Sequence, residues 1–378
     1  MRNTLIAVLA ASALALTACG NAETSDDGGR GGASGDKPSQ LVMATYGTGT
    51  ATYVDLAAVS EAITKASGTA IRIITSDTAI GRLTPLREGQ ADFARTGDEY
   101  VFSFEADYDF ASEAWGPQDM RVVWAPTAPH GLLVKDGSSI KTFEDLKGKK
   151  FPRITANPSV NNKLEAFLAY GGLTWDDVEV VEVGYSDQPD ALKNGQIDVL
   201  FQQVYGASLF ELASSTPVRW LSMDNEDAAR VDAVEEIAPS TAIGAFSDAP
   251  GQEEGEEAKG LMYAVPLVTY ADKDPATVNY LVSQIIENHA TYADATATAP
   301  GWAPDAAQLV PTQVPFHEGT VQVLEEKGLW TEEAEERNEA LIARGEALRE
   351  GWEEFIAEAD TANLAAEWAA WKDANLPE

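Results

Sequence analysis

Cysteine is nearly absent from this sequence, since Cys19 is the only one among 378 residues. A single cysteine excludes a disulfide within the chain and a cysteine-based zinc or iron–sulfur site. Histidine is also scarce: the chain has only His130, His289 and His317. No two of them share the spacing of a metal site on a helix. The sequence therefore predicts a fold held together by an ordinary core, with no metal and no cofactor.

Positive charge is in short supply as well. The chain has 26 Lys and Arg against 61 Asp and Glu, a formal net charge of −35. Nucleic acid and anionic lipid surfaces repel such a chain, which argues against both as partners. Two interpretations of the acidity stay open. It is either an ordinary solvated surface or an adaptation to high salt, where a Debye length of about 3 Å at 1 M makes self-repulsion tolerable.

Long apolar runs are missing too, apart from a short one at the N-terminus between Leu5 and Leu16. That run is too short to cross about 30 Å of hydrocarbon comfortably. Arg2 precedes it and small residues follow it, which is typical of a signal peptide. Its last residues, Leu16-Thr17-Ala18-Cys19, resemble a bacterial lipobox, which implies cleavage before Cys19 and a lipid on its sulfur. A chance cysteine in an ordinary signal peptide and a short membrane anchor are the alternatives.

The N-terminal region therefore divides into a lipoprotein signal peptide, residues 1–18, and a flexible tether, residues 19–40. The tether is rich in Gly, Ser, Asp and Asn and has no apolar periodicity. About 20 such residues give a root-mean-square reach of roughly 25 Å.

Strand and helix patterns alternate from Leu41 onward. Leu41–Tyr46 and Ile71–Thr75 have strand patterns, and Tyr53–Ser67 between them has a helical one. A second series begins near His130 and includes a helix over Ser159–Tyr170, for which Ser159 is a candidate N-cap. Strand–helix–strand units are typical of a mostly parallel sheet, so the chain is predicted to hold two α/β lobes.

Helical patterns also dominate the end of the chain. Asp274 and Pro275 open a helix that runs to about Tyr292, with Asp as N-cap and Pro at the first helical position. From Glu318 to Trp371, apolar residues recur at helical spacing. Amphipathic helices docked on the body explain this pattern best, and a dedicated interaction arm is the alternative.

Catalytic motifs are missing: there is no Gly-x-Ser-x-Gly elbow and no phosphate loop. His317 precedes a helix and is interpreted as a capping or packing residue. Polar loops instead follow several strands, and they lie in both lobes. Ligands bind at the carboxyl ends of strands in open α/β sheets. The four loops are residues 45–53, 75–79, 157–162 and 202–205.

Several segments, in the same order along the chain, resemble solute receptors of the TAXI family, which serve TRAP transporters. They span about residues 41–330: Ala44–Tyr53, Leu86–Ala94, Ile140–Lys149, Leu192–Asp198 and Pro315–Gly319. The resemblance implies an α/β, periplasmic-binding-protein-like (type II) fold with two lobes joined by a hinge. We expect lobe 1 to hold residues 41–128 and 243–330, lobe 2 to hold residues 129–242, and residues 331–378 to form extra C-terminal helices packed on the body.

The same resemblance implies an extracytoplasmic solute-binding lipoprotein without enzymatic activity. It would capture a small organic anion, a carboxylate or an amino acid, between the lobes and deliver it to the subunits of a TRAP-type membrane permease. We expect a monomer anchored by lipid to the outer face of the cytoplasmic membrane. A secreted lipoprotein enzyme and a sensory or scaffolding lipoprotein on the same fold remain as alternatives.

Ligand-binding residues follow from carrying the family pattern onto the polar loops. They are Thr48, Thr50, Tyr53, Ser76, Thr78, Ser159, Asn162, Gln202, Gln203 and Tyr205.

Arg95 is a further candidate, because a guanidinium near a strand end can clamp a carboxylate through two hydrogen bonds. The alternative is a salt bridge with Asp98, with Glu99 or with an acid on a neighbouring strand. Arg82 and Arg153 are secondary candidates for the same role.

Overall fold

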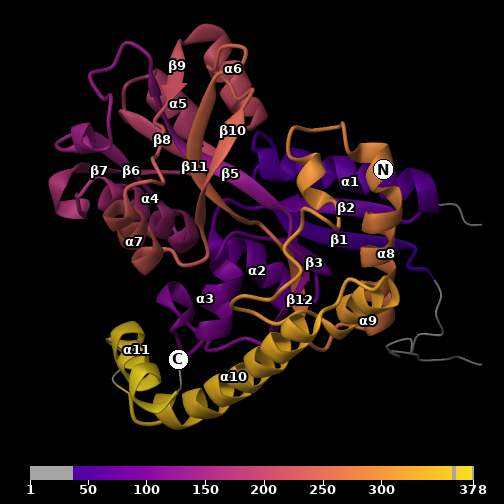
Figure 1. Cartoon of the computed structure of the whole chain (residues 1–378). Helices are drawn as coiled ribbons and strands as arrows, with labels where there is room; N and C mark the ends of the chain where they lie inside the picture. Colours follow the sequence, from indigo (N-terminus) through magenta and orange to yellow (C-terminus); the bar gives the residue numbers. More distant parts are fainter. Residues whose placement is uncertain (1–36, 360–362, 377–378) are drawn as a thin grey trace, which may run out of the picture. The chain divides into compact units, whose positions relative to one another are not determined.

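The computed structural model describes residues 37–359 and 363–376 (Figure 1). The predicted signal peptide, Cys19 and nearly all of the tether lie outside the described residues. Within the described ranges, no helix combines the length and the apolar character needed to cross a membrane.

Lobe 1 is built on a five-stranded sheet. β1 (Gln40–Thr45) pairs in parallel with both β2 (Ala70–Thr75) and β3 (Phe93–Arg95). β12 (Leu267–Tyr270) enters from late in the chain and lies antiparallel between β3 and β4 (Met120–Trp124). The strand order is therefore β2-β1-β3-β12-β4.

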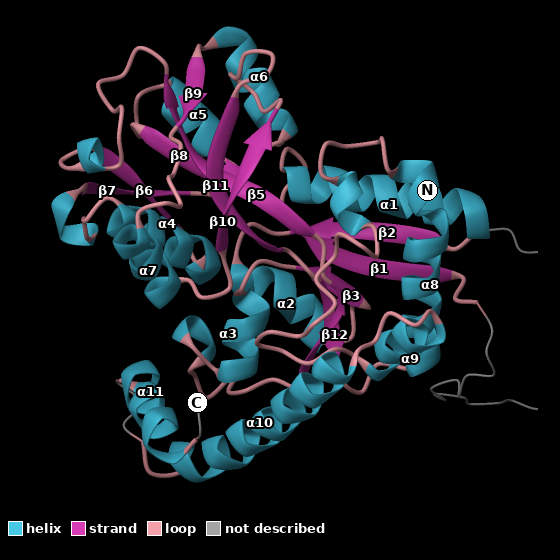
Figure 2. Cartoon of the chain, in the orientation of Figure 1, coloured by secondary structure: helices cyan, strands magenta, loops and turns pink. Residues whose placement is uncertain are grey.

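Helices cover both faces of this sheet (Figure 2). On one face lie α1 (Ala51–Ser67), α8 (Pro275–Tyr292) and α9 (Glu318–Glu326), whose apolar side chains form one core cluster with β1 and β3. On the other lie α2 (Ala79–Arg87) and α3 (Glu99–Glu105), which belong to a second cluster. The strand–helix alternation of the sequence is confirmed here.

Lobe 2 differs from the predicted mostly parallel sheet. β5 (Thr127–Lys135) pairs antiparallel with β8 (Val199–Gln203), β9 (Val218–Trp220) and β11 (Glu257–Ala264), and β11 pairs antiparallel with β10 (Ala242–Ser247). The directions follow from the path of the chain. β5 leaves lobe 1 and β11 returns to it alongside, so the two strands must run in opposite directions.

A parallel pair remains at the side of lobe 2, where β6 (Lys150–Ile154) and β7 (Glu179–Val183) are joined through α4 (Pro158–Tyr170). This is the predicted strand–helix–strand unit. The N-cap of α4 is Asn157, whose side chain accepts a hydrogen bond from Val160 N at 3.2 Å. Ser159 was the wrong prediction for this cap, because it already lies inside the helix.

The other helices of lobe 2 are short. They are α5 (Gln188–Lys193), α6 (Ala207–Ser215) and α7 (Ala228–Ile237). Single turns of 3-10 helix complete the connections of the two lobes: Tyr108–Phe110, Glu144–Leu146, Trp175–Asp177 and Ala299–Trp302.

The chain passes between the lobes twice, and the two passages lie side by side. The first joins β4 to β5 through Pro126, and the second joins β11 to β12 through Val265 and Pro266. Val265 N donates a hydrogen bond to Pro126 O at 3.0 Å. The return is therefore near residue 265 and not at 243 as the sequence suggested. The acidic, glycine-containing stretch 248–256 connects β10 to β11 within lobe 2 and is not a link between lobes.

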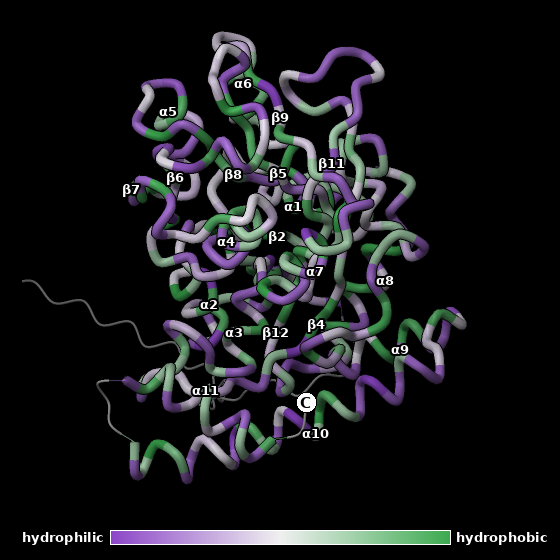
Figure 3. Tube along the Cα trace, turned by 60° about the vertical axis from the view of Figure 1, so that its left-hand side comes forward, coloured by the Kyte–Doolittle hydropathy of each residue, from purple (hydrophilic) through white to green (hydrophobic). Residues whose placement is uncertain are grey.

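The C-terminal helices α10 (Glu332–Ile356) and α11 (Leu364–Asn375) pack on lobe 1. Leu348 and Trp368 are fully buried in the same core cluster as Phe104 of α3. A glycine at position 345 lets α10 approach closely, since a Cβ there would lie 2.7 Å from the Phe104 ring. Figure 3 shows hydrophilic and hydrophobic stretches alternating along α10, as expected of a helix with one face on the protein.

Candidate functional site

The polar loops of the two lobes meet along one contact, which we call the seam. On lobe 1 it comprises residues 46–50, 76–79 and 96–98, together with Thr52 in the first turn of α1. On lobe 2 it comprises residues 156–163, 185–186 and 202–208. Local capping places these side chains: Thr50 caps α1 by accepting from Tyr53 N at 3.2 Å, and Thr78 caps α2 by accepting from Gly81 N at 3.1 Å.

Direct hydrogen bonds cross the seam at both ends. Thr52 Oγ1 donates to Gln203 Oε1 at 2.8 Å, which joins α1 to β8. Ser186 Oγ donates to Asp77 Oδ1 at 2.9 Å. At the other end, Ser159 Oγ accepts from Asp98 N at 2.7 Å. The two lobes therefore touch, and the structure represents a closed arrangement.

Two buried ion pairs lie along the seam. Arg82 pairs with Glu99 inside lobe 1, and both side chains are completely buried. The Arg82 guanidinium also lies over the Tyr46 ring, 3.6 Å from its centroid. Lys163 of α4 pairs with Asp98, and this ion pair crosses between the lobes. Burial raises the pKa of the Tyr46 hydroxyl well above its usual value, so that phenol stays protonated.

Arg95 finds its partner within lobe 1. Its Nη2 lies 3.3 Å from Asp55 Oδ2, and its Nη1 donates to Thr52 O at 2.7 Å. The partner acid thus comes from α1, and the salt bridges to Asp98, to Glu99 or to a neighbouring strand that the sequence suggested are wrong. A carboxylate ligand would have to displace Asp55, so the role of Arg95 as a ligand clamp stays a prediction. Burial lowers the pKa of Arg95, and Asp55 offsets part of that shift.

Of the ten other predicted residues, only Tyr53 lies outside the segments that form the seam. Three of the nine within these segments, Thr48, Asn162 and Tyr205, have different surroundings from the rest. Thr48 is exposed, Tyr53 is half-buried on α1, and Tyr205 donates to Ser247 O at 2.7 Å inside lobe 2. Asn162 donates to Ile237 O at 2.7 Å and faces the cavity described below. Arg153 stacks 4.6 Å from the Trp175 ring, away from Arg82 and Arg95.

Several residues of the seam were not found from the sequence. Lys163 follows Ser159 by four residues and so lies on the same face of α4, a spacing that could have identified it. Tyr185 packs against Tyr46, with ring centroids 5.1 Å apart and the ring planes tilted by 51°. Asp77, which lies in the predicted polar loop 75–79 but was not a candidate ligand-binding residue, receives hydrogen bonds from Ser186 of lobe 2. No local pattern marks these two contacts, because their partners are distant in the sequence.

Polar atoms at the seam are left without partners among the described residues. They come from the ends of strands in both lobes and from the loop that follows β3: Thr45 Oγ1, just before the seam, and Thr96 Oγ1, Gln202 Oε1 and Gln203 Nε2 within it. A buried polar group without a hydrogen bond costs about 1–3 kcal/mol. Four such atoms at and beside one contact indicate a surface able to bind a polar molecule.

The three histidines each bond to backbone. His317 Nδ1 accepts from Gly319 N at 3.0 Å and caps α9, which confirms the capping role predicted for it. His130 lies beneath the seam, stacked 4.1 Å from the Tyr263 ring, with Nδ1 3.1 Å from Ala128 O. Burial lowers the pKa of His130 to about 3. His289 Nε2 lies 3.1 Å from Ala299 O.

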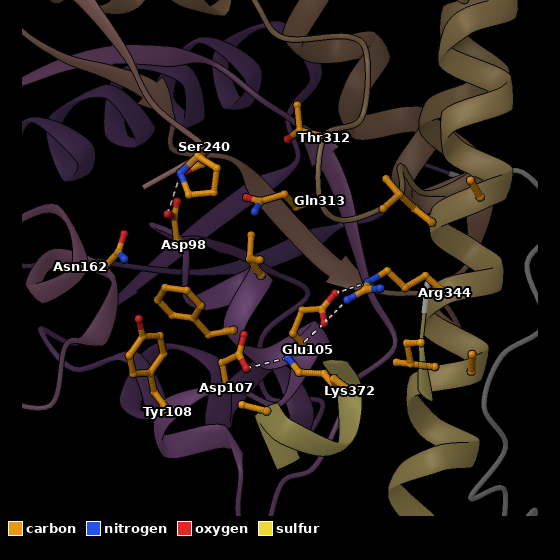
Figure 4. Close-up of a pocket in the computed structure, with 18 of the residues that line it drawn as sticks. Asp98, Glu105, Asp107, Tyr108, Asn162, Ser240, Thr312, Gln313, Arg344 and Lys372 are labelled. Carbon is orange, nitrogen blue, oxygen red and sulfur yellow. Dashed lines mark hydrogen bonds and ion pairs between the residues drawn. The ribbon is translucent and has the colours of Figure 1, made fainter. Parts of the chain in front are cut away.

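A cavity of about 890 Å³ opens beside the seam (Figure 4). Asp98 belongs to both, since it forms part of the seam and lines the cavity. Within the described part of the chain, no group of three or more His, Cys, Asp or Glu side chains is placed to hold a metal ion.

One protein-family model matches most of this chain. The model of the NMT1-like family matches residues 43–328, well over half of the chain. The chain belongs to the NMT1-like family. A comparison with curated proteins finds no match.

Solved structures with a similar chain course include three binding proteins. A binding-protein component of an ABC phosphonate transporter from Pseudomonas aeruginosa is 13% identical, with a TM-score of 0.48, over 90% of this chain and 96% of that chain. The alkanesulfonate-binding protein SsuA of Xanthomonas axonopodis pv. citri, bound to MOPS, is 16% identical, with a TM-score of 0.43, over 82% of this chain and 98% of that chain. The aliphatic sulphonate binding protein SsuA of Escherichia coli is 18% identical, with a TM-score of 0.42, over 81% of this chain and 99% of that chain.

Proposed function

We propose that this protein is a solute-binding protein that encloses a small polar molecule between its lobes. The observation that carries this proposal is the set of buried polar atoms at the seam that lack partners and come from both lobes. A ligand that satisfies acceptors and donors on the two lobes at once stabilises the closed arrangement over an open one. The ligand thereby shifts the population toward closure.

The proposed ligand is a small organic anion, a carboxylate or an amino acid. The charges at the seam distinguish between these two. Each buried cation there already faces a carboxylate: Arg82 faces Glu99, Arg95 faces Asp55 and Lys163 faces Asp98. A zwitterion can meet both members of such pairs without leaving a buried charge unpaired, whereas a plain carboxylate cannot. The geometry therefore favours an amino acid.

Closure depends on the two adjacent passages between the lobes. Within residues 37–359 and 363–376, the stretches around Pro126 and Val265–Pro266 are the two connections between the sheets, and a hydrogen bond joins them. Rotation about this narrow connection would part the seam while leaving each sheet intact. Hinge motions of this kind use a few residues at the ends of elements.

For the partner, we propose a membrane permease of the TRAP type, on the strength of the sequence segments that resemble TAXI receptors. The Pseudomonas aeruginosa structure named above is described as a component of an ABC phosphonate transporter, and an ABC permease is the competing partner. A lipid on Cys19 would hold the protein at the outer face of the membrane. Co-purification with the permease encoded nearest to this protein's own gene would distinguish the two partners.

A thermal-shift screen of amino acids and organic acids tests the proposed function. A ligand present at 100 times its Kd stabilises the folded state by about 2.7 kcal/mol, which is a readily measured shift. We expect at least one zwitterionic amino acid to raise the melting temperature and to reduce the radius of gyration. If no member of the library does either, the proposal fails.

A further inference from the structure

We propose a second ligand site in the cavity that α10 and α11 form with both lobes (Figure 4). Its ligand is a small molecule with an apolar body and a hydrogen-bond-donating head, an ammonium or a hydroxyl group. The volume of about 890 Å³ falls within the roughly 300–1,000 Å³ typical of small-molecule sites.

The apolar part of the cavity is built from three regions of the chain. Phe102 of α3 lines the cavity from lobe 1, and Ile237 at the end of α7 lines it from lobe 2. Leu341 of α10 brings a third. The rest of the C-terminal wall is mostly alanine, and such short side chains leave the space open: Ala340, Ala343, Ala347, Ala365 and Ala369.

Two acceptors in the lining have no donor among the described residues. Asp98 is only 4% exposed, and its Oδ1 is buried without a partner. Its other oxygen, Oδ2, already accepts from Ser240 Oγ at 2.8 Å and pairs with Lys163. Gln313 Oε1 is likewise buried without a partner. Unsatisfied acceptors of this kind call for a ligand that donates.

Two of the three cations that line the cavity already face acids, which disfavours an anionic head. The third, Arg337, is exposed, and its Nη2 donates to Thr312 O at 2.6 Å. Arg344 Nε lies 2.7 Å from Glu105 Oε1, so this cation already faces an acid. Lys372 lies 3.2 Å from Glu105 Oε2 and 2.7 Å from Asp107 Oδ1. The Asp98 carboxylate, in contrast, keeps one oxygen free for a donor. An ammonium or hydroxyl head fits these partners, and a carboxylate head does not.

The cavity is complete only while the lobes are together, because lobe 2 contributes Asn162, Ile237, Pro239 and Ser240, and the remaining wall comes from lobe 1 and the C-terminal helices. A ligand bound there favours closure. By linkage, it also strengthens binding at the seam, and seam ligands strengthen it by the same factor. This coupling rests on the proposed function, whereas binding in the cavity does not.

Calorimetric titration of the protein with three eight-carbon probes tests the site: n-octylammonium, 1-octanol and octanoate. We expect octylammonium and octanol to bind at least tenfold more tightly than octanoate. Equal binding of all three probes, tighter binding of octanoate, or no binding at all would overturn the proposal. Because the probes are titrated directly, the result is independent of whether any seam ligand is found.

A matched pair of substitutions on α11 locates the probe. Ala369 lines the cavity, and the adjacent Ala370 does not; both are exposed, so the fold tolerates a large side chain at either position. Ala369→Trp should weaken octylammonium at least tenfold, and Ala370→Trp should leave it unchanged. Equal effects of the two would contradict the assignment.

Removing one acceptor tests the head group. Gln313→Leu keeps a side chain of similar size and should weaken octylammonium and octanol several-fold. An unchanged affinity for both probes would show that the head does not meet Gln313 and would overturn the proposed orientation.

Discussion

The seam and the cavity share Asp98, yet they are opposite kinds of surface. The seam is polar and filled, with hydrogen bonds and an ion pair running directly from one lobe to the other. The cavity is mostly apolar and open, and alanines of α10 and α11 form part of its wall. Directional polar groups favour one ligand and one closed geometry, whereas an apolar space tolerates variation in the body of its ligand. The difference suggests that recognition is concentrated at the seam, and that the C-terminal helices add a less selective contact.

The largest expected effect comes from forcing the seam apart. A Cβ on Gly97 would collide with Ser159 Oγ and lie 2.9 Å from Tyr46 Oη. Gly97→Val should therefore prevent closure and reduce affinity for the seam ligand by at least 100-fold. Calorimetry with the best ligand of the screen measures this. Gly137→Val is the control, because a Cβ at Gly137 has no neighbour within 4 Å.

Breaking the ion pair across the seam is the next largest change. Lys163→Met leaves the Asp98 carboxylate buried without its cation, and removing one partner of a buried pair costs about 3–5 kcal/mol. Opening of the lobes relieves part of that cost, so we expect both a lower melting temperature and a larger radius of gyration. The double variant Lys163→Met/Asp98→Asn should recover most of the stability. A single variant as stable and as closed as the parent would show that the pair does not hold the lobes.

Acidic pH should lower the free energy of unfolding, because His130 is buried in its neutral form. Its folded pKa of about 3 lies below the unfolded value of about 6.5, so the unfolded state binds the proton first as the pH falls. The stabilisation by neutral His130 is complete above pH 6.5 and is lost progressively below it. We expect a loss of about 2 kcal/mol between pH 7 and pH 5. Urea unfolding at both pH values should show that the free energy of unfolding changes less with pH in His130→Gln than in the parent protein. The same change with pH in both proteins would refute the assignment.

The smallest effect is expected at the docking of α11. Lys372 bonds Glu105 and Asp107, and its side chain is 11% exposed. Glu105 keeps Arg344 as a partner and the Asp107 side chain is 32% exposed, so Lys372→Met should cost only about 1 kcal/mol. Affinity for the seam ligand should stay the same, because these contacts lie within lobe 1 and the C-terminal helices. A large loss of seam affinity in this variant would show that the two surfaces are not separable.

Much of the fold could be predicted because local signals determine it. The strand predicted at Leu41–Tyr46 is observed at Gln40–Thr45, and Asp274 caps α8 by accepting from Thr277 N at 3.1 Å. The position of the return to lobe 1 could not be predicted. β11 joins lobe 2 by pairing with β5, which lies more than 100 residues earlier in the chain, and β10 follows as the neighbour of β11.

The candidate site follows the same division. The polar loops were found because residue type and position at strand ends are visible in the sequence. The ion-pair partners of the charged residues could not be predicted, because Arg95 pairs with Asp55 and Lys163 pairs with Asp98, each across a long separation in the sequence. The cavity gave no signal, because its lining residues come from distant parts of the chain and its alanines also occur on ordinary helix surfaces.

Small-angle scattering with and without the best seam ligand tests the central claim most directly. If the protein encloses a solute between its lobes, the ligand should reduce the radius of gyration of the parent protein and leave that of Gly97→Val unchanged. A ligand that binds both proteins equally tightly, with no change in either radius of gyration, would contradict the account.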